Sequence, residues 1–258
     1  QAYTLDQTAP ATTVSTVVFS NDTGVSSTDL ITNAASQDIS GTLSANLTAD
    51  ESVEVSSDNG GTWTTASTTV GKNTYSLTGQ TLTGSDTLKV RVVDVAGNTG
   101  TASADAYAYD TIAPTTVTIK LSTSTLKVGS TSNVTFTFNE KVGNFDNNDV
   151  TVANGTLSTV TSADGGLTWT AVFTPTADIE DATNIITVDK STLTDLAGNA
   201  GTGTTNSSNY KVDTKRPTAT VAMSDTDLKI GDTSKVTFTF SEAVSGFTNA
   251  DLLIDNGT

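Results

Sequence analysis

The chain has 258 residues, with 28 Asp and Glu against 12 Lys and Arg and a formal net charge of −16. It contains no Cys and no His, which excludes disulfides, thiol nucleophiles and the commonest general base and transition-metal ligand. Any bound metal should therefore be a hard cation held by oxygen. The acidity argues against nucleic acid as a partner, because phosphate selects clusters of Lys and Arg. No apolar run approaches the ~18 residues of a membrane span, so we expect no membrane insertion.

The composition favours strands and short turns over helices. Hydrophobic residues make up 35% and charged residues 16%, and Thr, Ser, Asn and Gly supply much of the rest. Asp-Asn-Gly-Gly in segment 56–66 and Asp-Gly-Gly in segment 162–172 predict hairpins. Each turn precedes a Trp, Trp63 or Trp169, which we expect in a core. Roughly seven to nine short strands per hundred residues predict an all-β chain of immunoglobulin-like β-sandwiches in tandem, forming an elongated array.

Internal repeats divide the chain into domains. Tyr, an apolar residue, Asp and Pro recur in YTLDQTAP (3–10), YAYDTIAP (107–114) and YKVDTKRP (210–217), each typical of a last strand followed by a stiff linker. The predicted division is residues 1–5, the tail of a preceding repeat or a linker; 6–109, a first Ig-like domain; 110–212, a second Ig-like domain; and 213–258, the N-terminal part of a truncated third.

The third segment repeats the start of the second domain. VGSTSNVTFTFNEKVGNFDNNDVTVANGT (128–156) matches IGDTSKVTFTFSEAVSGFTNADLLIDNGT (230–258), which aligns Glu140 with Glu242 and Phe145 with Phe247. A half sandwich would leave strand edges and an apolar face in water. We therefore expect a window from a longer array, with the third domain completed by further strands or by another chain.

One motif occurs twice, as VVDVAGNTG (92–100) and LTDLAGNAG (193–201). The apolar run predicts a strand, and Ala-Gly-Asn predicts a tight turn, because Gly and Asn enter positive φ at little cost. Asp94 and Asp195 should then lie where a strand leaves its sheet, at one end of each domain.

Strand direction predicts where the acidic residues gather. In the second domain, the first strand runs away from Asp110, and alternate strands return toward that end with Glu140 and Asp195. The loop after Glu140 places Asp146 and Asp149 there as well.

The first domain repeats this pattern, because Asp50, Glu51 and Asp94 follow strands that return to the end where Asp6 enters. Asp213 and Glu242 would begin a third set. The candidate metal ligands are therefore Asp6, Asp50, Glu51, Asp94, Asp110, Glu140, Asp146, Asp149, Asp195, Asp213 and Glu242.

Carboxylates gathered at one end repel one another unless a cation or protons intervene. Ca²⁺ accepts roughly 6–8 oxygens in irregular geometry, which suits Asp, Glu and turn carbonyls from several loops, whereas Mg²⁺ demands tighter octahedral order. The alternative is that the Asp of each Asp-x-Ala-Gly-Asn motif only caps its own turn. The repetition of the whole set favours Ca²⁺ as the cofactor, and no EF-hand loop is present.

Two other Asp residues, Asp22 and Asp29 in NDTGVSSTDLITN, lie by the same reasoning at the far end of the first domain. They either face the junction with the second domain or form turns, and turns are favoured.

The motifs VSSDNGGTWTTA, VVDVAGNTG and DTIAP resemble bacterial Ig-like repeats of large secreted adhesins of the biofilm-associated and RTX types. VTFTFNEKV, NNDVTVANGT and LTDLAGN resemble a second, related repeat, and together the resemblances span nearly all the chain. They imply a secreted, cell-surface location, neighbouring Ig-like repeats of the same chain as partners, and calcium at domain junctions. They point to Asp6, Asp94, Asp110, Glu140, Asp195 and Asp213 as ligands.

Three classes of function can be weighed against these features. The first is a structural extender of an adhesin with calcium-rigidified junctions. The second is a module that binds a glycan or host protein, which requires an exposed aromatic or polar cluster, yet aromatic residues make up only 6% of the chain. The third is an enzyme, which we do not expect, because the acidic sets recur in each domain and no nucleophile motif is present. The sequence does not specify an adhesion target.

Overall fold

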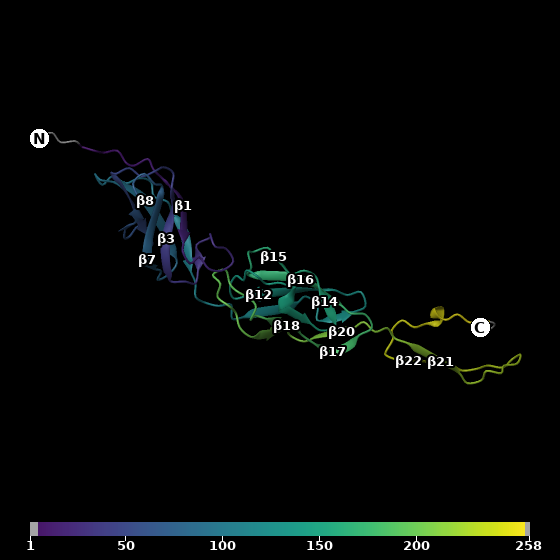
Figure 1. Cartoon of the computed structure of the whole chain (residues 1–258). Helices are drawn as coiled ribbons and strands as arrows, with labels where there is room; N and C mark the ends of the chain where they lie inside the picture. The colour runs from purple at the N-terminus through teal and green to yellow at the C-terminus, as the bar shows by residue number, and fades with distance from the viewer. Residues whose placement is uncertain (1–4, 256–258) are drawn as a thin grey trace.

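A computed structural model describes residues 5–255 as two β-sandwiches and a β-hairpin arranged in a row (Figure 1). Residues 1–4, most of the predicted segment 1–5, and residues 256–258 lie outside this description. We call residues 6–109 the first module, 110–212 the second module and 213–255 the third segment. Within residues 5–255 the helices are two three-residue 3₁₀ turns, η1 (Asn147–Asp149) and η2 (Asn249–Asp251), and neither could cross a membrane.

The first module is a sandwich of two sheets. One sheet has the order β1-β3-β7-β6 and the other β2-β9-β8-β4-β5. β2 pairs in parallel with the last strand, β9, and the other pairs are antiparallel. The strands are β1 (Val14–Phe19), β2 (Ile31–Thr32), β3 (Ser36–Leu43), β4 (Glu51–Ser56), β5 (Thr64–Thr65), β6 (Ser67–Thr68), β7 (Thr74–Thr81), β8 (Asp86–Asp94) and β9 (Asp105–Tyr109).

The second module repeats this plan. One sheet has the order β10-β12-β16-β14, and β15 also pairs with β16. Two smaller sheets have the orders β11-β20-β17 and β13-β18-β19. β11 again runs parallel to the last strand, β20. The strands are β10 (Val117–Leu121), β11 (Thr125–Lys127), β12 (Ser132–Phe138), β13 (Val150–Val152), β14 (Gly155–Leu157), β15 (Thr161–Ser162), β16 (Thr168–Pro175), β17 (Glu180–Asn184), β18 (Ile186–Asp189), β19 (Thr204–Asn206) and β20 (Tyr210–Asp213). The predicted all-β fold of tandem Ig-like sandwiches is confirmed.

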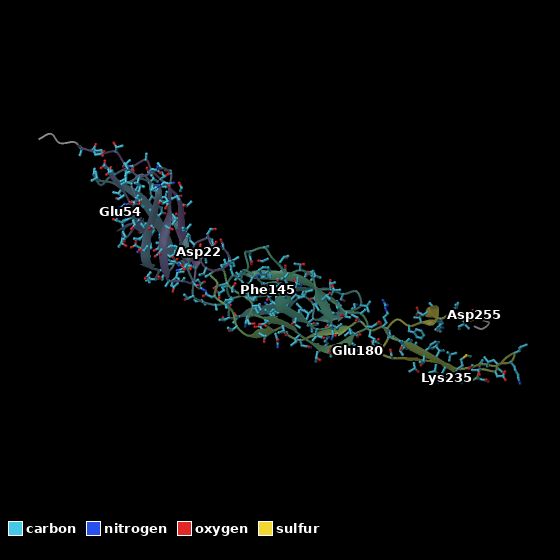
Figure 2. All side chains as sticks on the ribbon, viewed as in Figure 1. Asp22, Glu54, Phe145, Glu180, Lys235 and Asp255 are labelled. Carbon is cyan, nitrogen blue, oxygen red and sulfur yellow. The ribbon has the colours of Figure 1, made fainter. Side chains whose placement is uncertain are left out.

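Each module has its own core, built on strand alternation. In β12, Val134, Phe136 and Phe138 are buried, while the intervening Thr side chains face outward or are partly covered. Phe145, from the loop after β12, meets Phe136 edge-on at 5.2 Å between ring centroids and is 3% exposed. Figure 2 marks Phe145 within the second module. Trp169 also packs on this core.

Trp63 departs from the expectation of a core position. Its ring lies under the guanidinium of Arg91, with the guanidinium carbon 3.8 Å from the ring centroid, and it does not belong to the core of the first module. The ion pair of Arg91 with Glu54 at 2.7 Å fixes the guanidinium above the ring. Trp63 is therefore only partly buried and stacks on a cation instead of packing in the core.

The third segment has a single hairpin of β21 (Ala219–Met223) and β22 (Val236–Phe240). Phe247 contacts Phe238 and Phe240 edge-on, as Phe145 contacts its neighbours in the second module. In residues 5–255 no second sheet covers this hairpin, and Phe247 is 42% exposed. The same sequence pattern therefore gives a buried core in one place and an open face in the other.

The substitution Phe145→Ala should lower the free energy of unfolding of the second module by about 3–5 kcal/mol, because it removes a buried ring and leaves a cavity. The matched substitution Phe247→Ala should leave the transition of the second module unchanged. Calorimetry of the two variants checks this; equal losses would contradict the packing described.

Candidate metal centre at the junction between modules

The repeated motif forms the same turn in both modules. In the second module, the carboxylate of Asp195 accepts hydrogen bonds from the backbone N–H of Asn199 at 2.8 Å and from its side-chain Nδ2 at 2.7 Å. In the first module, Asp94 accepts the corresponding bonds from Asn98, both at 2.8 Å, and the side-chain bond lowers the pKa of Asp94. Each Asp therefore does cap its own turn.

The Asn of the motif also holds the incoming linker. Asn199 donates from Nδ2 to the backbone carbonyl of Asp110 at 2.8 Å, and Asn98 donates to the carbonyl of Asp6 at 3.3 Å. The motif thus binds the chain that enters its own module, which explains why it recurs once per module.

The last Gly of the motif leaves room for that linker. A Cβ on Gly201 would lie 3.0 Å from the carbonyl oxygen of Pro114, and a Cβ on Gly100 would lie 3.0 Å from that of Pro10. Since a real side chain rarely tolerates such a distance to backbone, both positions favour Gly.

Two further side chains fix the linker from the body of the second module. Asn139 accepts the N–H groups of Thr115 and Thr116 at 3.1 and 3.0 Å, and donates to the carboxylate of Glu140 at 3.0 Å. Lys190, which is 6% exposed, donates from Nζ to the carbonyl of Thr115 at 2.8 Å. The path of the linker and the position of Glu140 are therefore set together.

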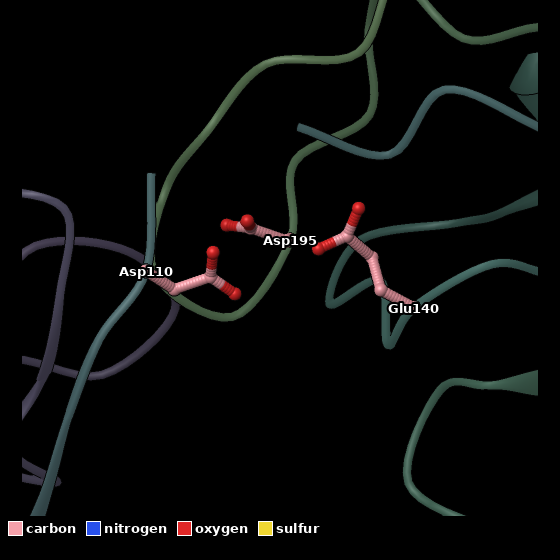
Figure 3. Close-up of side chains that lie close together, drawn as sticks. All are labelled: Asp110, Glu140 and Asp195. Atoms are coloured by element: carbon pink, nitrogen blue, oxygen red, sulfur yellow. The ribbon is translucent and has the colours of Figure 1, made fainter. Parts of the chain in front are cut away.

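Three carboxylates meet at this junction. Asp110 lies in the linker after β9, Glu140 follows β12, and Asp195 opens the second copy of the motif. One oxygen of each lies within 4.8 Å of the other two, and Figure 3 shows the three side chains pointing toward one another from separate segments. Asp195 is buried, and the other two are partly exposed. In residues 5–255 this is the only such group of three.

The electrostatics of this group are unfavourable without a counterion. The pKa of Glu140 is raised, mainly by burial, and the charges of Asp110 and Asp195 raise it further. Of the described residues, only Arg91–Glu54 and Lys215–Glu180 form ion pairs, so no basic side chain neutralises the three carboxylates. The three carboxylates offer only oxygen ligands, and two of them are partly exposed to water. Such a site fits a hard divalent cation such as Ca²⁺.

The structure does not bring Asp146 and Asp149 into this group. Asp146 caps η1 by accepting from Asn148, while Asp149 accepts from the N–H of Asp146 at 2.8 Å and from the hydroxyl of Thr192 at 2.5 Å. The loop lies at the predicted end, but its acids satisfy the backbone and a neighbouring loop.

The acids of the first module lie at one end, as predicted, with Glu51 opposite Asp94 in the β4–β8 pair, but their side chains are engaged in local bonds. The carboxylate of Asp6 accepts from the N–H of Thr8, and that of Glu51 accepts from Thr48. Asp50 contributes its backbone carbonyl to Val95. With Asp94 capping its turn, these four do not form a group of three. Asp213 and Glu242 are exposed and are not part of one either.

The sequence interpretation missed the residues that hold the linker. Asn98 and Asn199 were assigned only to their turns, and Lys190 and Asn139 were given no role. Recurrence of the Asn in both copies was the available signal, since a turn alone is equally well made by Gly or Asp.

Comparison with known proteins places this architecture in a family. Residues 8–111 match one family model and residues 110–212 and 213–258 match a second, both described as bacterial Ig-like domain. These matches cover nearly all the chain, which therefore belongs to the bacterial Ig-like domains. No curated protein matches it.

Several solved structures are similar to this chain. The Escherichia coli adhesin FdeC matches at 15% identity with a TM-score of 0.43, over 93% of this chain and 78% of that one. Invasin, a bacterial integrin-binding protein, matches at 15% identity with a TM-score of 0.37, over 93% of this chain and 49% of that one. The fibronectin(III)-like modules of Clostridium thermocellum CbhA match at 17% identity with a TM-score of 0.34, over 77% and 94%.

The substitution Glu140→Gln should raise the melting temperature of the second module in chelator at pH 7. The raised pKa means that ionised Glu140 is disfavoured in the folded state, so its cost is present above the raised pKa and disappears as the pH falls below the ordinary value of 4.5. Because the interacting carboxylates are partly solvated, we expect the free energy of unfolding to rise by about 0.5 kcal/mol, which corresponds to a rise of about 2–4 °C in the melting temperature. Calorimetry from pH 7 to pH 4 should show the gain vanish; a gain that grows on acidification would contradict it.

The substitution Asn199→Ala should destabilise the second module by about 1–3 kcal/mol, because three side-chain hydrogen bonds are lost: two that Asn199 donates and one that it accepts from Asn33. Asn206→Ala, which removes an amide bonded to Thr187 on an exposed strand, is the control and should cost less. Urea unfolding gives both values, and equal losses would remove the linker-holding role of Asn199.

Proposed function

We propose that this chain is an extender segment of a secreted bacterial surface adhesin, in which Ca²⁺ at the junction holds neighbouring Ig-like modules in line. The observation that carries the proposal is the meeting of a linker carboxylate, Asp110, with Glu140 and Asp195 of the following module. One oxygen of each lies within 4.8 Å of the others, and none of the three has a basic partner among residues 5–255. Membership of the bacterial Ig-like domains supports the tandem role.

The ligands differ in what they fix. Asp195 and Glu140 are tied to the second module through Asn199 and Asn139, whereas Asp110 belongs to the chain that leaves the first module. The N–H of Asp110 also bonds the carbonyl of Thr32 in β2, at 3.0 Å. Holding Asp110 against the other two carboxylates therefore couples the first module to the second.

A bound Ca²⁺ would supply the positive charge that the three carboxylates lack, and three carboxylates can provide up to six of its roughly 6–8 oxygens. Water can reach the remaining positions, because Asp110 and Glu140 are partly exposed. Without the ion, repulsion among the three opposes close approach and leaves the hinge more freedom. Cation binding that requires both modules then stabilises the pair by linkage.

Calcium at about 100 times its Kd should stabilise the second module by ~2.7 kcal/mol, which corresponds to a rise of about 10 °C or more in the melting temperature. It should also narrow the range of bending angles between the first and second modules. Asp110→Asn should abolish both effects. Asp178→Asn removes the same charge from the far end of this module at a positive φ that Asn tolerates, and should keep them.

Calorimetry and small-angle X-ray scattering with calcium and with chelator measure these quantities. Identical melting curves and scattering profiles in the two conditions would refute the extender mechanism. Loss of the calcium effect in Asp178→Asn as well would locate the ion elsewhere.

A further inference from the structure

A segment of the first module, made of the β1–β2 loop, β2 and Asn33, lies against the turn that carries Asp195. We call residues 21–33 the docking loop. The hydroxyl of Thr23 donates to the carbonyl of Ala197 at 2.6 Å, and the N–H of Val25 donates to the carbonyl of Leu196 at 3.4 Å. Asn33 donates from Nδ2 to the side-chain oxygen of Asn199 at 3.2 Å. The turn that offers a ligand is therefore held from both modules.

Two glycines permit this close approach. A Cβ on Gly24 would overlap the carbonyl oxygen of Leu196, and a Cβ on Gly143 would overlap the side chain of Val25. Val25 lies with Leu196 and Trp169 around a shallow hollow of the second module. The contact therefore combines neutral hydrogen bonds with close packing of backbone and an apolar side chain, and none of these groups is charged.

The docking loop is stiffened by its own hydrogen bonds. Asp22 accepts the N–H of Leu30 at 3.1 Å, and Leu30 is buried and has a left-handed φ of 60°. The N–H of Asn33 bonds the hydroxyl of Thr23 at 2.9 Å. Figure 2 shows Asp22 at the end of the first module that faces the second. Asp22 therefore forms the turn of a loop at the junction, which joins the two roles considered for it.

The other copy of the motif shows what docking changes. Ala197 is 1% exposed, whereas the corresponding Ala96 is exposed, and Val95 is 83% exposed. A Cβ on Gly97 would meet nothing within 4 Å, whereas one on Gly198 would meet Gly24 at 3.0 Å. The turns share their internal bonds, so the docking loop accounts for the difference.

We propose that the docking loop is a positioning element of the junction: it supplies no ligand, but it restrains the hinge without any cation and holds the Asp195 turn in its binding geometry. The cation half of this inference rests on the proposed function, whereas the restraint half does not. Reciprocity of linkage means that cation binding and docking each strengthen the other.

Gly24→Ala tests the restraint, with Gly71→Ala as the control. Both glycines have positive φ, +95° and +81°, so both variants carry the backbone strain, but a Cβ on Gly71 meets nothing within 4 Å. A second pair, Val25→Asn and Val70→Asn, introduces no strain at residues that are 57% and 64% exposed. Calorimetry of the first module verifies that each variant is folded.

The chain has no native Cys, so spin labels at Thr65→Cys and Thr151→Cys, both exposed, report the distance between modules without interference. In chelator, Gly24→Ala and Val25→Asn should broaden the distance distribution, and both controls should match the parent chain. In calcium titrations the same two variants should bind about tenfold more weakly, within the usual range of coupling between sites.

Equal distance distributions in chelator for Gly24→Ala and Gly71→Ala, and for the two Val variants, would overturn the positioning role. So would calcium affinity that does not change while the distributions broaden. Absence of calcium binding to the parent chain would instead refute the proposed function and the cation half, and the chelator measurement would still decide whether the loop restrains the hinge.

Discussion

The hydrogen bond from Asn199 to the carbonyl of Asp110 is the contact on which the junction depends. It ties the chain leaving the first module to a turn of the second, and it places the carboxylate of Asp110 beside Asp195. Because the acceptor is a neutral backbone group, this bond operates even where the carboxylates repel one another. One turn thereby holds the linker, offers a carboxylate and receives the docking loop.

Strand alternation and strand direction were the parts of this architecture that could be predicted from the sequence. In VTFTF, the alternation of Val, Phe and Phe with Thr matches the buried positions of β12, because a period of two is a property of the extended backbone. Counting strand directions placed Asp110, Glu140 and Asp195 at one end, and the structure brings these three together although they are distant in sequence. Direction determines the end of a domain at which a residue lies.

Strand direction does not determine which group a side chain contacts at that end. Asp149 lies at the same end, but its carboxylate is used by a backbone N–H and by Thr192. Trp63 follows a hairpin turn just as Trp169 does, yet Arg91 stacks on its ring and only Trp169 joins a core. The role of the docking loop could not be predicted from the sequence either. Its bonds to Ala197 and Asn199 join residues more than a hundred positions apart through main-chain groups and small side chains.

The parallel pairing of β11 with β20 has a mechanical consequence for a chain arranged in a row. β11 lies near the start of the second module and β20 at its end, so tension applied along the chain pulls the two strands in opposite directions along their length. The three residue pairs from Thr125–Lys211 to Lys127–Asp213 are then loaded simultaneously in shear and cannot open one at a time. Since forced rupture is governed by the rate of unfolding, this arrangement makes the second module resist stretching for longer than it would if its strands could peel apart from one end.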